Sequence, residues 1–291
     1  MTMERYELLK PYLDKYHRKF TVLDLGAGIN PLIAQRIALD YDAVVVMVEQ
    51  DQACMDYAGS NLVWLRKHFN LKELKLLANS EYFDVVIAFN FLHHFPKEEY
   101  GDAAAQVMSM GADVFIQIPS RQEPEGVPGF GEVIDGLNYM CNMYGGKLVA
   151  ETVQFPQHLP RPLFHFDNHD CEFLLTRTHI EAHQDSAATI IHPSYTDSIA
   201  HLKGKGDKVW VPGINLWNFC KLGGCRPTRE SILKSIFNFN LPTQHHGDVA
   251  PWNFIMDGEK LYLVDGYEGW EWDDKQGLEE TWKKVNECLS I

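Results

Sequence analysis

A glycine-containing turn follows the first apolar run of the chain and is typical of a ligand site. The run VLDLGAGINP places Gly26 and Gly28 where a strand is expected to lead into a helix. At such a junction the backbone N–H groups and the helix N-terminus face a ligand, and glycine lets the ligand approach the backbone. An ordinary tight turn without a ligand is the alternative for a bare G-x-G pair.

The residues around this turn favour a nucleoside over a dinucleotide. A dinucleotide site would carry a third glycine beside the pyrophosphate, but Pro31 occupies that position and suits the first turn of a helix. Glu49 ends the second apolar run, 21 residues after Gly28. A carboxylate at that point can accept both ribose hydroxyls. The predicted ligand is therefore a nucleoside without a pyrophosphate.

Three segments together resemble the class I S-adenosylmethionine-dependent methyltransferases. They are DLGAG after the first strand, the acid at the end of the second, and FDVVIAFNFLHHF at the fourth. The resemblance covers roughly residues 1–178. It implies a Rossmann-like sheet of seven strands and S-adenosyl-L-methionine as the cofactor.

The same resemblance assigns roles to individual residues. Glu49 would hold the ribose, and Asn90 and Leu92 would flank the sulfonium. Where the family often has an acid after the third strand to meet the adenine amine, this chain offers only Asn79 and Ser80. The methionine end of the cofactor would be lined by Asp24, Gly26, Ala27 and Gly28.

Two adjacent histidines follow the fourth strand. His93 and His94 lie at the carboxyl edge of the expected sheet, where open α/β folds bind their ligands. Methyl transfer is an in-line displacement, so a base is needed only when the acceptor must lose a proton, and histidine suits that role. The alternative is that one histidine packs under the following helix while the other is solvated.

Acceptor specificity is expected from the loops 119–131 and 156–170, because loops above a scaffold carry variable chemistry. Arg161 in the second loop, with its neighbouring histidines, could bind an anionic group such as phosphate or carboxylate. A solvated hairpin is the other possibility. The histidines His158, His165 and His169 have a spacing that matches no standard metal-ligand set.

A second group of polar residues lies near the C-terminus, in HGDVAPWN…LVDG. In phosphoryl transfer one Asp orients the attacking hydroxyl, an Asn five residues later binds magnesium, and a second Asp after a hairpin does the same. Asp248, Asn253 and Asp265 fit this order, which makes Asp248 a candidate base and the other two candidate ligands for Mg²⁺. A β-hairpin is expected between them, with the turn DGEK.

Residues 208–274 resemble the C-terminal lobe of aminoglycoside-phosphotransferase and choline-kinase types of kinase. The lobe that would supply a glycine-rich loop and a lysine is missing, because only about 30 residues separate the methyltransferase-like part from the hinge-like segment. Residues 179–291 are therefore expected to form a reduced, kinase-like α+β module. A structural role, with Trp252, Trp270 and Trp272 packed against the methyltransferase part, is expected for it.

The order of the two modules resembles the bifunctional methyltransferase/kinases that terminate O-antigen chains. The leading hypothesis is S-adenosylmethionine-dependent methyl transfer to a small or saccharide-linked acceptor, with phosphorylated acceptors included. A phosphotransferase or bifunctional enzyme is one alternative. A C-terminal module that serves only for docking or structure is another.

The elements that must position these residues follow an α/β rhythm up to about residue 178. Apolar runs predict strands, and the amphipathic stretches between them predict crossover helices. A loop over 119–131 leads to a helix over 132–144 and two final strands. The strands are expected at 21–25, 43–48, 83–89, 112–118, 147–155 and 171–176, and the helices at 31–41, 52–69 and 98–110.

The composition and net charge of the chain indicate which classes of binding partner are expected. The chain has 291 residues, of which 45% are hydrophobic, and a formal net charge of −14, so a soluble globular protein is expected. That charge repels phosphate backbones, which argues against nucleic acid as a main partner. Six cysteines without a C-x-x-C pair, no membrane-spanning run and no signal peptide indicate a cytoplasmic protein.

Overall fold

The computed structural model contains one large mixed sheet. It describes residues 2–51, 61–123, 130–154, 159–169, 189–191, 208–237, 251–258, 260–263 and 274–289. The sheet has eight strands in the order β11-β3-β2-β1-β4-β5-β7-β6, and the five strands from β3 to β5 run parallel. Its strands are β1 Thr21–Leu25, β2 Val44–Val48, β3 Leu62–Leu65, β4 Phe83–Phe89, β5 Gly111–Gln117, β6 Lys147–Gln154, β7 Leu159–Asp167 and β11 Gly224–Arg226.

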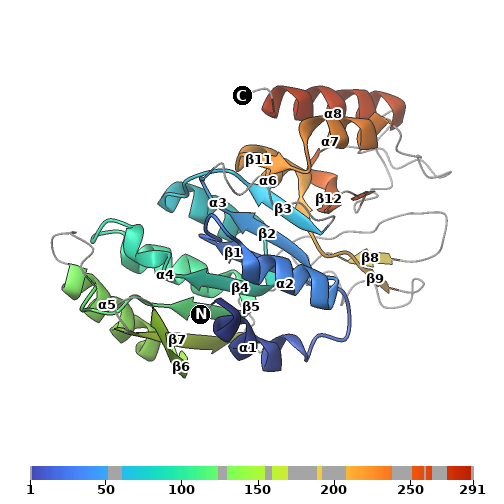
Figure 1. Cartoon of the computed structure of the whole chain (residues 1–291). Coiled ribbons are helices and arrows are strands. Elements are labelled where there is room, and N and C mark those ends of the chain that lie inside the picture. The colour runs from blue at the N-terminus through green and yellow to red at the C-terminus, as the bar shows by residue number, and fades with distance from the viewer. Residues whose placement is uncertain are drawn as a thin grey trace.

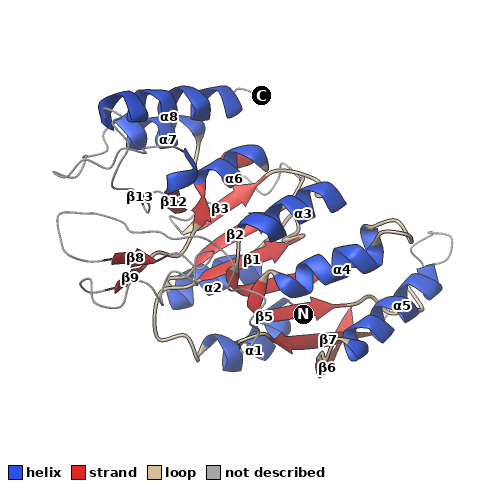
Figure 2. Cartoon of the chain, turned by 180° about the vertical axis from the view of Figure 1, so that it is seen from behind, coloured by secondary structure: helices blue, strands red, loops and turns tan. Residues whose placement is uncertain are grey.

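Helices cover both faces of this sheet (Figures 1 and 2). The central strands are buried on both faces, so they are apolar nearly throughout rather than alternating. Side chains such as Val45 and Ile87 pack with α1 and α2, while Val46 and Val86 pack with α3, α4 and α5. The helices are α1 Thr2–Leu13, α2 Leu32–Tyr41, α3 Leu71–Ser80, α4 Tyr100–Ser109 and α5 Phe130–Met143.

Most of the expected elements in the first half are confirmed, but the second expected crossover helix is not. A helix was expected over residues 52–69, whereas β3 occupies Leu62–Leu65 and the helix α3 begins only at Leu71. Asn70 caps α3, and with Glu73 it forms a capping box that fixes the helix start. Residues 52–60 lie outside the described residues.

The final strand pair also differs from expectation. The stretch 159–167 was expected to lie in the loop 156–170, but it forms β7, which pairs antiparallel with both β5 and β6. The burial of Leu163, Phe164 and Phe166 supplies packing that stabilises this strand. The strand expected at 171–176 lies outside the described residues.

The eighth strand comes from the C-terminal region and corrects the expected count of seven. The three-residue strand β11 pairs antiparallel with β3 at the edge of the sheet, through Gly224 and Arg226 (Figure 1). A three-residue strand far along the chain leaves no pattern that predicts its partner. The expected boundary between residues 178 and 179 falls outside the described residues.

The rest of the C-terminal region packs onto the same core as the sheet. Leu216, Phe219 and Phe254 belong to one continuous apolar cluster with residues of β1, β3 and α3. The hairpin expected around DGEK is confirmed, with Phe254 opposite Leu263. The described α-helices and strands of the C-terminal region, besides β11, are β8 Thr189–Ile191, β9 Lys208–Trp210, β10 Ile214–Asn215, α6 Leu216–Lys221, α7 Arg229–Phe237, β12 Phe254–Asp257, β13 Lys260–Leu263 and α8 Asp274–Cys288.

Polar contacts fix this region to the sheet. Glu81, which is 1% exposed, accepts hydrogen bonds from the Asn215 backbone N–H (3.0 Å) and from Asn218 Nδ2 (2.5 Å). Lys19 forms an ion pair with the buried Asp257 at 2.9 Å. These bonds place α6 and β12 against the amino-terminal part of the chain. Among the described helices, none has the length and apolar character needed to cross a membrane.

Candidate functional site

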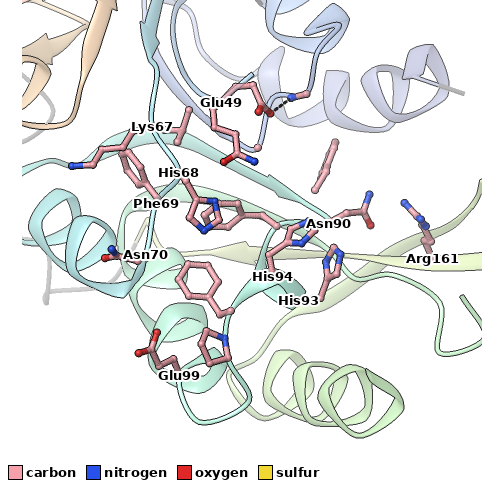
Figure 3. Close-up of a pocket in the computed structure, with 18 residues that line it drawn as sticks. Glu49, Lys67, His68, Phe69, Asn70, Asn90, His93, His94, Glu99 and Arg161 are labelled. Atoms are coloured by element: carbon pink, nitrogen blue, oxygen red, sulfur yellow. Dashed lines mark hydrogen bonds between the residues drawn. The ribbon is translucent and has the colours of Figure 1, made fainter. Parts of the chain in front are cut away.

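A cavity of about 790 Å³ opens at the carboxyl edge of the parallel strands. Open α/β sheets bind ligands at this edge, where successive strands end and loops diverge. Figure 3 shows Glu49 and Lys67 toward one side of the cavity and Arg161 toward the other. The volume suits a nucleoside-sized cofactor together with a small second molecule.

The glycine turn and Glu49 form one wall of the cavity. Gly26 (φ +72°) and Gly28 (φ +78°) adopt the left-handed conformation that glycine tolerates best. The Gly28 N–H donates to Glu49 Oε2 at 2.9 Å, and the Asp51 N–H donates to Glu49 Oε1 at 3.0 Å. A carboxylate can accept about four hydrogen bonds, so this one is oriented by the turn and keeps acceptor capacity for a ligand.

Asp24 lies directly behind the turn. It is 5% exposed, and burial together with the nearby Glu49 raises its pKa to about 7. Within the described part of the chain, no hydrogen bond or ion pair reaches its carboxylate. A bound group with positive charge would favour the ionised form of Asp24.

The wall after β3 is formed by residues that sequence reasoning missed. Lys67, His68, Phe69 and Asn70 all line the cavity, and Lys67 is held by Glu73 at 3.0 Å. These residues could have been predicted from the sequence only if the third strand had been placed correctly, because they follow directly after it. Asn79, which was expected to follow that strand, lies near the end of α3 and is not among the cavity-lining residues.

The wall after β4 contains Asn90, held in the left-handed conformation with φ +55°. Its Nδ2 donates to Gln117 Oε1 at 3.1 Å, and Gln117 Nε2 donates to Thr152 Oγ1 at 2.5 Å. The Thr152 hydroxyl lies 3.5 Å from the backbone carbonyl of Arg161, which can only accept. The direction of every bond is therefore fixed, and Asn90 Oδ1 is left buried without a partner among the described residues.

The two histidines lie in a 3-10 turn, Leu92–His94, with their ring centroids 3.9 Å apart. His93 is buried, and burial, with smaller effects of His94 and Arg161, lowers its pKa to about 3. His94 is exposed, and both rings line the cavity. Leu92 between the strand and the histidines is buried in the core and does not line the cavity.

Arg161 lines the far end of the cavity, and a second arginine, Arg5, lies near it without lining the cavity. Arg161 on β7 is 6% exposed and forms a bidentate ion pair with Glu123, with Nε to Oε1 at 2.6 Å. Arg5 on α1 lies over the ring of Phe89, another cavity residue, at 5.7 Å. Burial and then Arg161 lower the pKa of Arg5. The Arg5 Nε is buried without a partner among the described residues.

The histidines expected beside Arg161 lie elsewhere. His165 and His169 lie at the amino edge of the sheet, where their Nε2 atoms are 2.6 and 3.0 Å from the carboxylate of Asp113. Of the two alternatives, an Arg–His cluster does not form, because β7 is a strand and its length separates Arg161 from His165 and His169. His158 lies outside the described residues.

Of the expected cofactor residues, Gly26, Gly28, Glu49 and Asn90 line the cavity. Ala27 lies between the two glycines, and its N–H donates to the Val48 carbonyl at 3.2 Å. These placements bring the turn, the ribose candidate and the fourth strand to one cavity.

The C-terminal motif is described only in part. Asp248, Asp265, Trp270 and Trp272 lie outside the described residues, as does the side chain of Asn253. Trp252 was expected to pack against the methyltransferase part. It is 42% exposed, and its ring contacts Trp217 at 5.9 Å and Lys284 at 4.9 Å within the C-terminal region. No group of side chains suited to a metal ion is found among the described residues.

Comparison with known proteins finds similarity in structure but not in sequence. No protein-family model matches the chain, and no curated protein matches it. The bifunctional kinase-methyltransferase WbdD aligns over 98% of this chain and 78% of its own, with 18% identity and a TM-score of 0.45.

Two smaller methyltransferases align with part of the chain. A 1,6-didemethyltoxoflavin-N1-methyltransferase from Burkholderia thailandensis, crystallised with S-adenosylhomocysteine, covers 56% of this chain and 76% of its own, with 16% identity and a TM-score of 0.39. The methyltransferase domain of bacterial CtHen1-C covers 57% and 95%, with 11% identity and a TM-score of 0.40. Identities and scores this low do not identify a function.

Proposed function

We propose that the chain is an S-adenosylmethionine-dependent methyltransferase. The observation that carries the proposal is the arrangement of Glu49, whose carboxylate is held by the Gly28 and Asp51 N–H groups at the cavity wall. A pre-oriented carboxylate beside a glycine turn suits the two hydroxyls of a ribose, and no pyrophosphate-binding glycine follows. The cofactor would supply an electrophilic methyl group.

The residues present fit such a cofactor along the whole cavity. Asp24 does not line the cavity, but its buried carboxylate lies behind the turn and would provide negative charge near the methionine end. Glu49 provides acceptors for the ribose, and the segment 67–70 offers an aromatic side chain, Phe69, and polar groups for a base. Binding of this kind orients the methyl group and excludes water, which is most of what an in-line displacement requires.

The acceptor proposed here is a small molecule, alone or attached to a saccharide, that carries an anionic group such as phosphate or carboxylate. Arg161 lines the cavity, and Arg5 lies near it: burial, and then the charge of Arg161, lower the pKa of Arg5. An anion bound beside them would offset their mutual repulsion and supply a partner for Arg5 Nε. Arg161 is itself oriented by Glu123.

The histidines divide between two roles under this proposal. Because its pKa is about 3, His93 stays neutral at physiological pH and is a weak base, better suited to hydrogen bonding. His94 is exposed at the cavity and is the better candidate to remove a proton. An acceptor that is already anionic at the reacting atom needs neither.

We further propose that residues 1–178 form the catalytic part and that residues 179–291 are a structural appendage built onto its sheet. The shared core and the Glu81 contacts support this assignment. Phosphotransfer by Asp248, with Mg²⁺ on Asn253 and Asp265, is the alternative. Transfer of labelled γ-phosphate from ATP by the intact chain, abolished in Asp248→Ala, would establish the alternative.

Calorimetric titration with S-adenosylhomocysteine tests the main proposal. We expect the wild-type chain to bind it and Glu49→Ala to bind 30- to 1,000-fold more weakly, because two charge-assisted hydrogen bonds are worth about 2–4 kcal/mol. Glu99→Ala is the matched control, because Glu99 lines the opposite wall of the cavity and its substitution also removes one negative charge. Equal affinity in the wild type and Glu49→Ala would remove the ribose assignment.

A further inference from the structure

Strand β11 of the C-terminal region lies beside the strand that leads into the cavity wall. Gly224 is opposite Leu65 and Arg226 is opposite Trp64 in an antiparallel pair. The pairing extends one residue further, because the Arg66 N–H donates to the Gly223 carbonyl at 2.9 Å. The next residue, Lys67, is already part of the cavity lining.

Without β11, β3 would be a four-residue strand at the edge of the sheet. Short edge strands have few hydrogen bonds and open locally more easily than central strands. The segment 67–70 leaves directly from the end of β3 and provides four cavity residues. Its position therefore depends on how firmly β3 is held on its outer side.

A second connection runs from β11 to Glu49. Trp64 on β3 is fully buried, and its Nε1 donates to the backbone carbonyl of Glu49 at 2.9 Å. On the other side, Cys225 Sγ lies 3.6 Å from the Trp64 carbonyl. A shift of β3 would thus move both walls of the cofactor end of the cavity.

Strand β11 is itself firmly placed. A side chain at Gly224 would meet the ring of Phe219 at 2.4 Å, so β11 lies directly on this buried residue of α6. Helix α6 is fixed in turn by Glu81, through Asn215 and Asn218. A continuous set of contacts therefore runs from Glu81 at the end of α3, through α6, to β11.

We infer that the C-terminal segment 215–226 positions the cofactor wall of the cavity, so that cofactor affinity depends on residues that do not touch the cofactor. This inference rests on the proposed function, because it assigns the segment 67–70 and Glu49 to cofactor binding. The residues of β11 are positioning residues, and Gly223, directly before β11, contacts Arg66 at the start of the cavity wall.

Gly223→Ala tests the inference against a matched control. Gly223 has φ +75°, and a Cβ there would lie 3.2 Å from the Arg66 carbonyl oxygen. Gly145 has φ +80°, lies in the turn between α5 and β6, and would place a Cβ in open space. Alanine at either site suffers the same backbone strain. Only the first disturbs the contact between Gly223 and Arg66.

Calorimetric titration with S-adenosylhomocysteine is the main measurement, and the thermal midpoint is recorded alongside. We expect Gly223→Ala to weaken binding at least fivefold and Gly145→Ala to change it less than twofold, although both lower the midpoint. Wild-type affinity in Gly223→Ala would overturn the inference. Should that variant be too unstable to purify, Gly223→Asn and Gly145→Asn serve as the pair, because asparagine tolerates this conformation better.

Hydrogen exchange separates this inference from the proposed function. We expect the backbone amides of residues 66–70 to exchange faster in Gly223→Ala than in Gly145→Ala, with or without ligand. Failure of the wild-type chain to bind S-adenosylhomocysteine would contradict the proposed function. Unchanged exchange at 66–70 would contradict the positioning by β11, whatever the ligand result.

Discussion

The two edges of the sheet carry similar polar residues but satisfy them differently. At the amino edge, Asp113 accepts from Tyr16 at 2.8 Å and pairs with His165 and His169. Its neighbour Asp84 pairs with Arg18 at 2.6 Å. At the carboxyl edge, Asn90 Oδ1 and Arg5 Nε are buried without partners among the described residues.

This difference separates a structural cluster from a ligand site. A buried polar group that lacks a hydrogen bond costs stability, so a group left unpaired is expected where a ligand completes it. Counting residue types does not make this distinction, because the histidine-rich edge is the one whose bonds are already made. The predictions below test the contrast, from the largest expected effect to the smallest.

Asp113→Ala is expected to lower the free energy of unfolding by about 3–5 kcal/mol, because it leaves His165 and the Tyr16 hydroxyl buried without this partner. Chemical denaturation measures the loss. The affinity for S-adenosylhomocysteine should stay within twofold of wild type. A tenfold weaker affinity in a folded Asp113→Ala protein would contradict the view that this edge is structural.

The raised pKa of Asp24 predicts that the free energy of unfolding depends on pH. Its folded-state pKa of about 7 exceeds its ordinary value of 3.8, so the folded state binds more protons, and stability falls as pH rises from about 4 to 7. Asp24→Asn should remove up to about 4 kcal/mol of this dependence. Unfolding curves at a series of pH values, with the exposed Asp102→Asn as control, measure it. Parallel pH profiles for wild type and Asp24→Asn would contradict the prediction.

His93, at the same edge of the sheet, should give a pH dependence of stability with the opposite sign. Its pKa of about 3 lies below the ordinary value of 6.5, so the unfolded state binds the extra proton and stability is lost as pH falls below about 6.5. The loss should reach about 2 kcal/mol at pH 5 and be absent in His93→Gln. The same loss in both proteins would show that His93 is not buried in its neutral form.

Thr152→Val should have the smallest effect, about 1 kcal/mol, because it removes the acceptor for Gln117 Nε2. Thr152→Ser keeps the hydroxyl and is the matched control. The side-chain amide signal of Asn90 in an NMR spectrum should move in Thr152→Val alone, since Gln117 then loses its fixed orientation. An unmoved signal would contradict the series of hydrogen bonds that runs from the Arg161 carbonyl through Thr152 and Gln117 to Asn90.

The sequence predicted the carboxyl edge better than its surroundings. The glycine turn, Glu49 and Asn90 follow apolar runs that were recognised as strands, so local pattern was enough to place them. Lys67 and Phe69 were missed because β3 is only four residues long and was taken for a helix. The same error misplaced Asn79.

Partners that lie far apart in the chain gave no local signal. The Glu123–Arg161 pair and the Gln117–Thr152 bond join residues 38 and 35 positions apart. The addition of β11 to the sheet is also a long-range pairing, which propensity and turn chemistry cannot predict. The stretch 159–167 was expected to lie in a loop, yet it forms a strand that pairs with β6 and, across a long stretch of sequence, with β5.

A crystal structure of the chain with S-adenosylhomocysteine tests the central claim most directly. The account predicts the homocysteine portion at the Gly26–Gly28 turn, the ribose hydroxyls on Glu49 and the adenine against the segment 67–70. The sulfur should face the end of the cavity that holds Asn90, His94 and Arg161. Ligand density elsewhere on the molecule, or a cavity left empty at saturating ligand, would contradict the account.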